Sequence, residues 1–538
     1  MGKLSTPLKA LLCDKVSQVC GDILKENGID VTFSETKDQF QEQIGSANIL
    51  VVRSATTVTS DLLDEAKHLK LVVRAGTGVD NVNIEECSKR GVLVMNTPMS
   101  NTLSATEHTC ALIMALSRHV PQAAKSMKDG LWDRKKYMGT ELYGKTLGII
   151  GLGRIGREVA KRMQSFGMKT VGFDPIVTEE EALKCNITKL SLEETLRLSH
   201  YLTVHTPLIP QTKYLINSQT LSSCPKGVKV VNCARGGIIN EKDLLSALES
   251  GQCGGAALDV FELEPPTNSN LIQHEKVIST PHLGASTVEA QKRCGEDAAR
   301  QIVNFVQGVN YTGALNGFGI MNAVDPKIQP WMSLAYNFGI IIWKYIEKFL
   351  MTSFQDVKLA VNLKGCGLKT AKDSIIGAFY TGILKENNRN VNLVNAFKIF
   401  DQNKMDVQVN YEESTAAFFS VDIISKETVV WKIGGTSQGH NPTLLYIGNN
   451  SHLTCPLTLK DTFLFFPISK QTEIIEQLIQ KQDVCGNSLS SIIMPHEKKN
   501  ESWCVITAHG KLDAPESGKG FEMCFQVSVS PLSEVLPF

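Results

Sequence analysis

The chain has 538 residues, of which 42% are hydrophobic and 20% are charged, a composition typical of a globular protein with several buried cores. Lys+Arg and Asp+Glu both number 55, so the formal net charge is zero. This balance excludes a strongly basic nucleic-acid binder and an acidic disordered tail as descriptions of the whole chain. No apolar run approaches the roughly 18 residues that span a bilayer, and no signal-peptide core precedes Asp14.

The cysteines indicate a cellular compartment. There are 14 of them, dispersed along the chain without a C-x-x-C motif, and most lie in apolar stretches. We therefore expect reduced, buried thiols in a cytoplasmic protein that uses neither a disulfide framework nor a metal site.

The first hundred residues alternate short β-branched segments with helical patterns such as 60–69. Strands separated by helices predict a parallel sheet with crossover helices. The expected strands lie in residues 8–14, 31–35, 47–54, 69–76 and 92–98.

A long helical pattern at 101–118 precedes a second strand–helix alternation, which begins with TLGII at 146–150 and is followed by a further helix near 286–307. A Gly-, Asn- and Pro-rich stretch at 308–330 marks a boundary. Beyond residue 460, a β-α-β-β order suggests a ferredoxin-like module. The expected fold class is α/β, with two doubly wound parallel-sheet domains of Rossmann or flavodoxin type and C-terminal α+β domains of regulatory type.

The expected domain boundaries follow from these patterns. A substrate-binding domain is formed by 1–98 and the return helix 286–312, with a dinucleotide-binding domain at 99–285 inserted between them. An intervening α+β domain at 315–455 and a ferredoxin-like (ACT-like) module at 456–538 complete the chain.

A G-x-G-x-x-G motif follows the strand at 146–150 and opens a helix. Gly151 permits the tight turn, Gly153 lets the backbone approach a pyrophosphate, and Gly156 allows close packing of helix and strand. The next strand ends in Asp174, 18 residues after Gly156, where a carboxylate accepts hydrogen bonds from ribose hydroxyls and repels the 2′-phosphate of NADP. The sequence therefore predicts an NAD site.

Three chemically suitable residues follow successive strands of the same unit. Arg235 follows VKVVNCA, Glu264 lies in DVFELEPP, and His282 lies in STPHLGAS. Ligands of open α/β sheets bind beyond the carboxyl ends of the strands, so all three are expected beside the nicotinamide. An imidazole exchanges a proton near neutral pH, a carboxylate orients it, and an arginine binds a substrate carboxylate with two hydrogen bonds.

Each of these residues also has a structural interpretation. Taken alone, Arg235 is a solvated loop arginine, Glu264 a residue capping a turn before two prolines, and His282 a turn histidine. Glu262 lies in the same segment, so the residues alone leave open which acid pairs with the histidine. We expect His108 and His205 to be structural, since one lies in an apolar helix and the other ends a strand.

The segments LGIIGLGRIG, VNCARGG, ALDVFELEPP and TPHLGAST resemble the D-isomer-specific 2-hydroxyacid dehydrogenase family. The resemblance covers residues 1 to about 312, and it implies the catalytic roles of Arg235, Glu264 and His282. It further implies that substrate carboxylate and phosphate meet Arg53, Arg74 and Asn101. The cofactor contacts it implies, besides the glycines, are Thr77, Arg154, Ile155, Asp174, Thr206, Ala234, Asp259 and Gly284.

RAGTGVDNV, KDGLWDRKKY and the long C-terminal extension are similar to members that oxidise a phosphorylated substrate. The expected reaction is thus NAD-dependent oxidation of D-3-phosphoglycerate to 3-phosphohydroxypyruvate, the entry to serine synthesis, in a homo-oligomer, a dimer or a tetramer. Two alternatives stay open. One is a dehydrogenase for another 2-hydroxy acid, and the other is an NADH-sensing transcriptional corepressor of the same fold.

Overall fold

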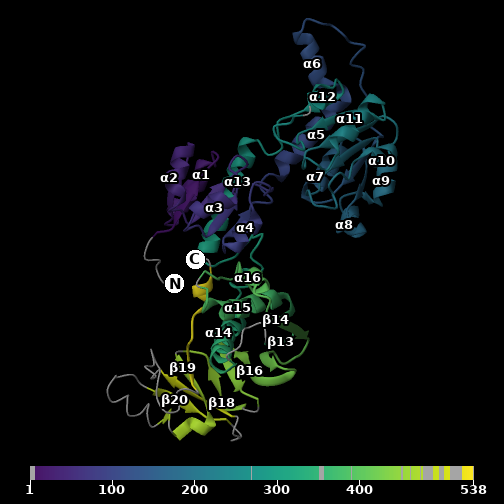
Figure 1. Cartoon of the computed structure of the whole chain (residues 1–538). Coiled ribbons are helices and arrows are strands. Elements are labelled where there is room, and N and C mark those ends of the chain that lie inside the picture. Colours follow the sequence, from purple (N-terminus) through teal and green to yellow (C-terminus); the bar gives the residue numbers. More distant parts are fainter. Residues whose placement is uncertain are drawn as a thin grey trace. The chain divides into compact units, whose positions relative to one another are not determined.

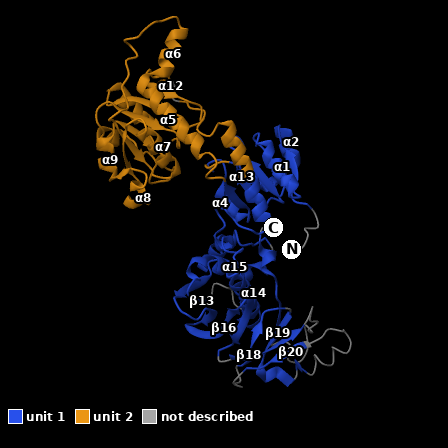
Figure 2. Ribbon diagram, turned by 180° about the vertical axis from the view of Figure 1, so that it is seen from behind, with its two compact units in different colours: residues 1–75, 79–96, 298–538 blue, residues 76–78, 97–297 orange. Residues whose placement is uncertain are grey.

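The structure is a computed structural model of the whole chain, coloured along the sequence in Figure 1. It divides into two compact units, shown in Figure 2: one comprises residues 1–75, 79–96 and 298–538, and the other comprises residues 76–78 and 97–297. The residues that the structure describes are 7–267, 269–350, 357–388, 390–449, 452–460, 462–472, 474–475, 489–495, 502–508 and 524–536. Among these residues, no helix combines the length and the apolar character that crossing a bilayer requires.

The first sheet is parallel, with strand order β2-β1-β3-β4-β5, the flavodoxin-like arrangement. Its central strands are apolar on both faces, because crossover helices cover both sides of such a sheet. The strands are β1 (Lys9–Leu12), β2 (Asp30–Phe33), β3 (Ile49–Val52), β4 (Leu71–Arg74) and β5 (Leu93–Asn96), and the helices are α1 (Gln18–Glu26), α2 (Lys37–Ile44), α3 (Ser60–Glu65) and α4 (Ile84–Lys89).

The second sheet has seven parallel strands in the order β12-β11-β10-β9-β6-β7-β8. Strand order reverses between β6 and β9, which is the topological switch point where dinucleotides bind in such folds. The strands are β6 (Thr146–Ile150), β7 (Lys169–Phe173), β8 (Thr188–Lys189), β9 (Tyr201–Val204), β10 (Val228–Asn232), β11 (Cys253–Leu258) and β12 (Val277–Ser279). The helices are α5 (Thr102–Arg118), α6 (Val120–Lys128), α7 (Arg154–Gln164), α8 (Glu179–Leu183), α9 (Leu192–Leu198), α10 (Ser218–Ser222), α11 (Glu241–Glu249) and α12 (Ser269–Gln273), and the chain then continues through α13 (Val288–Val306), whose residues are divided between the two units.

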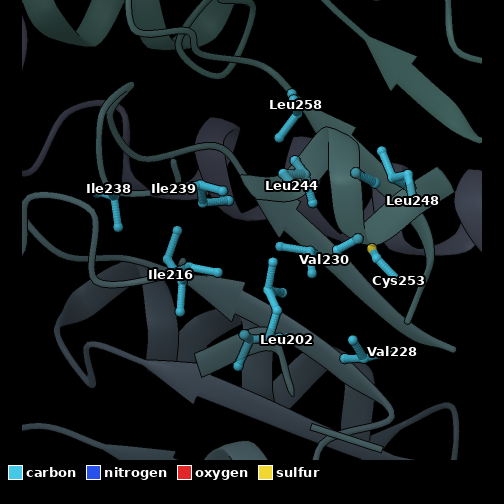
Figure 3. Packing of buried hydrophobic residues seen from close by; sticks show 14 of the residues in the cluster. Leu202, Ile216, Val228, Val230, Ile238, Ile239, Leu244, Leu248, Cys253 and Leu258 are labelled. Carbon is cyan, nitrogen blue, oxygen red and sulfur yellow. The ribbon is translucent and has the colours of Figure 1, made fainter. Parts of the chain in front are cut away.

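Two apolar clusters hold this sheet from its opposite faces. Val230 and Val231 are neighbours on β10, yet they belong to different clusters, because successive side chains of a strand point to opposite sides. Figure 3 shows the first cluster, in which Leu202, Val230 and Leu258 from three strands meet Leu244 and Leu248 of α11. This packing makes the strand ends a rigid platform for the loops that follow them.

After α13, the chain returns to the edge of the first sheet. Ala314 forms a bridge with Met95 of β5, and the Asn316 side chain accepts a hydrogen bond from Val94 N at 2.8 Å while donating to Val92 O at 2.9 Å. These contacts attach the C-terminal half of the chain to the N-terminal sheet and explain why both belong to one compact unit.

The C-terminal half contains two further sheets. In the larger sheet, β13 and β14 are parallel and the remaining pairs are antiparallel. In the smaller sheet, all pairs are antiparallel and the strand order is β20-β21-β19-β22. This is the order of a split β-α-β module. The expected helix at 471–480 lies mostly outside the described residues. The strands are β13 (Lys358–Lys364), β14 (Asp406–Glu412), β15 (Phe418–Ser425), β16 (Thr428–Gln438), β17 (Asn441–Ile447), β18 (His452–Thr458), β19 (Thr462–Pro467), β20 (Leu489–Ile493), β21 (Trp503–Ala508) and β22 (Phe525–Ser528), and the helices are α14 (Gln329–Tyr345), α15 (Lys372–Lys385) and α16 (Ala396–Gln402). The predicted fold class, two parallel α/β sheets followed by α+β structure, is confirmed.

Candidate active site

The glycine motif forms the turn from β6 into α7. Gly151 has φ +95°, and a Cβ there would lie 2.6 Å from His205 O. A Cβ on Gly156 would lie 2.1 Å from Gly151 O, so only glycine lets the helix start pack on the turn. At Gly153, by contrast, a Cβ would have no atom within 4 Å. Gly153 therefore faces open space beside the turn, next to the uncapped first amides of α7.

Asp174 follows β7 and fastens the same turn. Its carboxylate accepts hydrogen bonds from the amides of Leu152 at 2.9 Å, Ile176 at 2.8 Å and Val177 at 3.1 Å. Burial alone would raise the pKa of Asp174, but these amides together hold it below its usual value. The group is thus ionised at neutral pH, and a carboxylate has about four lone-pair positions, so it can also accept from a ligand hydroxyl.

Thr206 provides a separate indication of a ligand beside this turn. Its Oγ1 is buried and has no hydrogen-bond partner within the part of the chain that the structure describes, and its methyl group lies 3.0 Å from a Cβ position on Gly151. A buried hydroxyl without a partner is costly, and a bound polar group would relieve that cost. The turn therefore fits a dinucleotide, because it offers open space at Gly153, the uncapped first amides of α7 and the unpaired Thr206 hydroxyl.

The other expected cofactor contacts lie nearby in the same unit. The Arg154 guanidinium donates to Pro98 O at 3.0 Å, and Thr77 Oγ1 donates to Asn101 Oδ1 at 2.6 Å. Ile155 packs on one apolar cluster of the sheet and Ala234 on the other. Asn101, expected to contact substrate, is therefore already bonded to a residue expected to contact cofactor.

His282 and Glu264 form a hydrogen-bonded pair. His282 Nδ1 lies 2.7 Å from Glu264 Oε2, while Glu264 Oε1 accepts from Phe261 N at 3.2 Å. Glu262 is directed elsewhere, accepting from Tyr214 Oη at 3.2 Å. Of the two acids in this loop, Glu264 is the one beside the imidazole.

The charges of this pair reinforce one another. The hydrogen bond to Glu264 raises the pKa of His282 above its usual value, against an opposing effect of burial. Burial favours a higher pKa for Glu264, but the imidazole holds the pKa of that carboxyl below its usual value. Because Nδ1 faces Glu264, Nε2 is the ring atom left to exchange a proton with a substrate.

Arg235 completes a group of three at neighbouring strand ends. It follows β10, Glu264 follows β11, and His282 follows β12, and these three strands are adjacent in the sheet. The half-buried Arg235 donates from Nη1 to Ala234 O at 2.6 Å, and its charge acts to lower the pKa of His282. A guanidinium, an imidazole and a carboxylate thus share one electrostatic environment.

Asp259 directly follows β11 and is fully buried. Its carboxylate accepts from Thr280 Oγ1 at 2.6 Å, Leu283 N at 2.7 Å and Gly284 N at 2.8 Å, so it braces the loop that carries His282. His108 of α5 also reaches it, with Nε2 3.2 Å from Asp259 Oδ1. Sequence reasoning assigned His108 no role, because a helix histidine and a strand-end aspartate 151 residues apart share no local pattern.

His205 differs from both histidines just described. It is partly buried, with Nε2 3.0 Å from Thr203 Oγ1, and burial lowers its pKa to about 4. It is therefore neutral at physiological pH and serves the packing of the turn.

Arg53 and Arg74 lie in the other compact unit. Arg74 ends β4, and Arg53 follows β3 directly, where Val52 pairs with Arg74, so both arginines start from one edge of the sheet. The backbone of Arg53 is fixed by Asp14, which accepts from its amide at 2.8 Å, and by Asn81, which donates to its carbonyl at 2.7 Å. Two guanidinium groups at adjacent strand ends suit a doubly charged anion.

Comparison with known proteins agrees with this geometry. Residues 110–284 match the D-isomer specific 2-hydroxyacid dehydrogenase, NAD binding domain. The chain is 48% identical over 407 residues to human D-3-phosphoglycerate dehydrogenase, covering 75% of each chain, and 43% identical over 390 residues to the Bacillus subtilis enzyme of that name, covering 72% of this chain and 73% of the relative.

Solved structures show the same likeness. The TT0316 protein from Thermus thermophilus superposes with a TM-score of 0.52 at 30% identity, covering 57% of this chain and all of that chain. D-lactate dehydrogenase from Aquifex aeolicus, solved with NAD and lactic acid, superposes with a TM-score of 0.50 at 27% identity, covering 56% of this chain and 96% of that one.

Proposed function

This chain belongs to the D-isomer specific 2-hydroxyacid dehydrogenase family, and we propose that it catalyses the NAD-dependent oxidation of D-3-phosphoglycerate to 3-phosphohydroxypyruvate. Relatives named D-3-phosphoglycerate dehydrogenase match across three-quarters of the chain, which supports this substrate. The observation that carries the proposal is the 2.7 Å contact between His282 Nδ1 and Glu264 Oε2, with Arg235 following the neighbouring strand.

Bound at the glycine turn, NAD supplies the acceptor for the hydride that leaves the substrate carbon. Asp174 accepts hydrogen bonds from the ribose hydroxyls, and the first amides of α7 receive the phosphates. Gly153 keeps that approach open, because a side chain at this position would occupy the open space beside the turn through which the phosphates approach.

His282 acts as the general base of the oxidation. Its Nε2 accepts the hydroxyl proton while the hydride departs, so the hydroxyl carbon becomes a carbonyl and the proton stays on the imidazole. Glu264 favours the resulting imidazolium, since its hydrogen bond raises the pKa of His282. In the reverse direction the same imidazolium returns the proton to the keto oxygen.

Arg235 orients the substrate for this exchange. A bidentate guanidinium–carboxylate contact fixes the carboxylate in plane and so presents one face of the neighbouring carbon to the cofactor. Arg53 and Arg74 receive the phosphate, which distinguishes this substrate from lactate or glyoxylate.

We also infer a cytoplasmic homo-oligomer, a dimer or a tetramer. No disulfide joins any of the cysteines in the described ranges, which supports a reducing compartment. The segment that follows α6 exposes large apolar side chains, with Trp132 72% and Met138 78% accessible, which supports burial against a second copy. Analytical ultracentrifugation tests this, and a monomer at micromolar concentration would contradict it.

The substrate is tested by measuring kcat/KM for D-3-phosphoglycerate, D-glycerate and D-lactate from the rate of NADH formation. We expect a strong preference for the phosphorylated acid, because two additional arginines recognise its phosphate. Equal or higher kcat/KM for an unphosphorylated acid would instead assign the chain to another 2-hydroxy acid.

A further inference from the structure

Asp259 is a buried carboxylate that depends on its hydrogen-bond donors. It has no solvent exposure, and burying an ionised carboxylate is unfavourable unless donors replace water. Burial accordingly acts to raise the pKa of Asp259, but the donors around it, His108 and Thr280 first among them, hold that pKa below its usual value. Asp259 is thus an anion because its neighbours keep it so.

The geometry assigns the hydrogen of His108. Its Nε2 lies 3.2 Å from Asp259 Oδ1 and 3.1 Å from Thr280 Oγ1. Thr280 has one hydroxyl hydrogen and donates it to Asp259 Oδ1 at 2.6 Å, so its oxygen can only accept from His108. Asp259 can only accept as well. His108 Nε2 therefore carries a hydrogen that both groups share.

The Asp259 donors flank the proposed catalytic base. Thr280 lies two residues before His282, and Leu283 and Gly284 follow it. The amide of His282 itself donates to Asp259 O at 2.9 Å. His282 has φ +55°, a left-handed conformation that a non-glycine residue adopts only when its surroundings hold it there.

We propose that His108 is a positioning residue for the reaction: from α5, it donates to Asp259 and Thr280 and thereby holds loop 280–284 so that His282 faces Glu264. This inference rests on the proposed function for its kinetic consequence, but not for its structural one. Because the pair is anchored on a long helix packed against the sheet, the loop is tied to the rigid part of the unit.

The electrostatic consequence has a definite sign. The charged groups facing His282 are Glu264 and Asp259, which raise its pKa, and Arg235, which lowers it. The titratable groups facing Asp259 are His108, His282, Glu264 and the Cys233 thiol, and the thiol stays neutral because burial raises its pKa to about 12. Without the His108 donor, the ionised form of Asp259 is less stable and loop 280–284 is held less firmly. Both changes lower the pKa of His282.

The direct test follows the imidazole resonances of His282 by NMR as a function of pH, in cofactor-free protein labelled at histidine. Assignment comes from the resonance missing in His282→Asn. We expect a lower His282 pKa in His108→Phe, which removes the donor but keeps a ring, and restoration in His108→Gln, whose amide replaces the Nε2–H. An unchanged pKa in His108→Phe, or no difference between the two variants, would overturn the proposal.

Kinetics provide the second readout. Loss of a hydrogen bond to a charged group corresponds to a fall in kcat of about tenfold or more in His108→Phe, with KM changed much less. Recovery is expected in His108→Gln, and Glu107→Gln, an exposed neighbour on the same helix, is the matched control. A fall in both kcat and thermal stability without any shift of the pH profile would mean a purely structural role and overturn the proposal.

A second variant tests the same network if His108→Phe fails to fold. Thr280→Ala removes the bridging hydroxyl, and the same lowering of the His282 pKa is expected. An enzyme inactive toward phosphoglycerate would refute the proposed function alone, because the titration of His282 needs no substrate.

Discussion

Replacing Glu264 by Gln tests the hydrogen-bonded pair of Glu264 and His282 at the centre of the proposed chemistry. The substitution keeps the size of the side chain and removes its charge from beside His282, 2.7 Å away. A hydrogen bond to a charged group contributes about 1.5–3 kcal/mol. The side chains of His282 and Glu264 are 45% and 38% exposed, so solvent screening places the loss at the lower end, which corresponds to roughly tenfold in rate.

The pH dependence gives this prediction its sign. Glu264 raises the pKa of His282, and reduction of the keto acid requires the protonated imidazole. Reductase activity is therefore full at low pH and is lost as the pH rises through the His282 pKa. In Glu264→Gln that pKa falls, so the alkaline loss moves to lower pH.

The same linkage applies to stability. A raised histidine pKa contributes stability that is complete below about 6.5, its ordinary value, and is lost as the pH rises through the folded-state pKa. Wild type should therefore lose more stability than Glu264→Gln over this interval.

The assay is the consumption of NADH with 3-phosphohydroxypyruvate across pH, with Glu262→Gln as the matched control in the same loop. If wild type and Glu264→Gln lost reductase activity over the same alkaline pH range, the role of the pair would be refuted. An equal shift in Glu262→Gln would refute it as well.

Three further substitutions test other parts of the account. Arg74→Ala should raise KM for the phosphorylated substrate about tenfold or more and leave D-glycerate less affected, and equal effects on both would reject the phosphate contact. Asp174→Ser should lower the ratio of NAD to NADP efficiency, and it should also lower thermal stability because three amides lose their acceptor; an unchanged cofactor ratio would remove the ribose assignment. Gly156→Ala should destabilise the fold by about 1–3 kcal/mol through overlap with Gly151 O, whereas Gly153→Ala should leave the melting temperature unchanged and weaken NAD binding; the reverse pattern in thermal and NADH-fluorescence titrations would contradict the glycine roles.

Local patterns were sufficient for the two parallel sheets. The five predicted N-terminal strands agree with β1 to β5, and the helical patterns at 101–118 and 286–307 agree with α5 and α13. The reason is physical: buried parallel strands are short, β-branched runs, and amphipathic helices repeat every 3.6 residues, so each element is encoded within its own segment.

Structure that depends on distant partners was less accessible. β18 is exposed over most of its length and was not predicted, since its pairing with β17 rather than its composition makes it a strand. The return of residues 314–316 to β5 likewise depends on the Asn316 side chain meeting backbone groups more than 200 residues away.

The candidate site likewise combines residues that local patterns could place with residues that they could not. The grouping of Arg235, Glu264 and His282 was predicted from their positions after strands, because the fold brings the ends of parallel strands together. The resemblance favoured Glu264 over Glu262, whereas the residues alone did not, since both acids occupy one loop and only the direction of each side chain separates them. His108 could not be found from sequence, because its relation to Asp259 exists only after folding.

The most direct test of the central claim is His282→Ala, measured for NADH binding by fluorescence and for phosphoglycerate oxidation by absorbance. We expect NADH affinity close to that of wild type and a fall in kcat of roughly 10² or more, because the glycine turn is intact while the proton acceptor is gone. Retention of wild-type kcat, or loss of NADH binding alone with no change in turnover at saturating cofactor, would contradict the account.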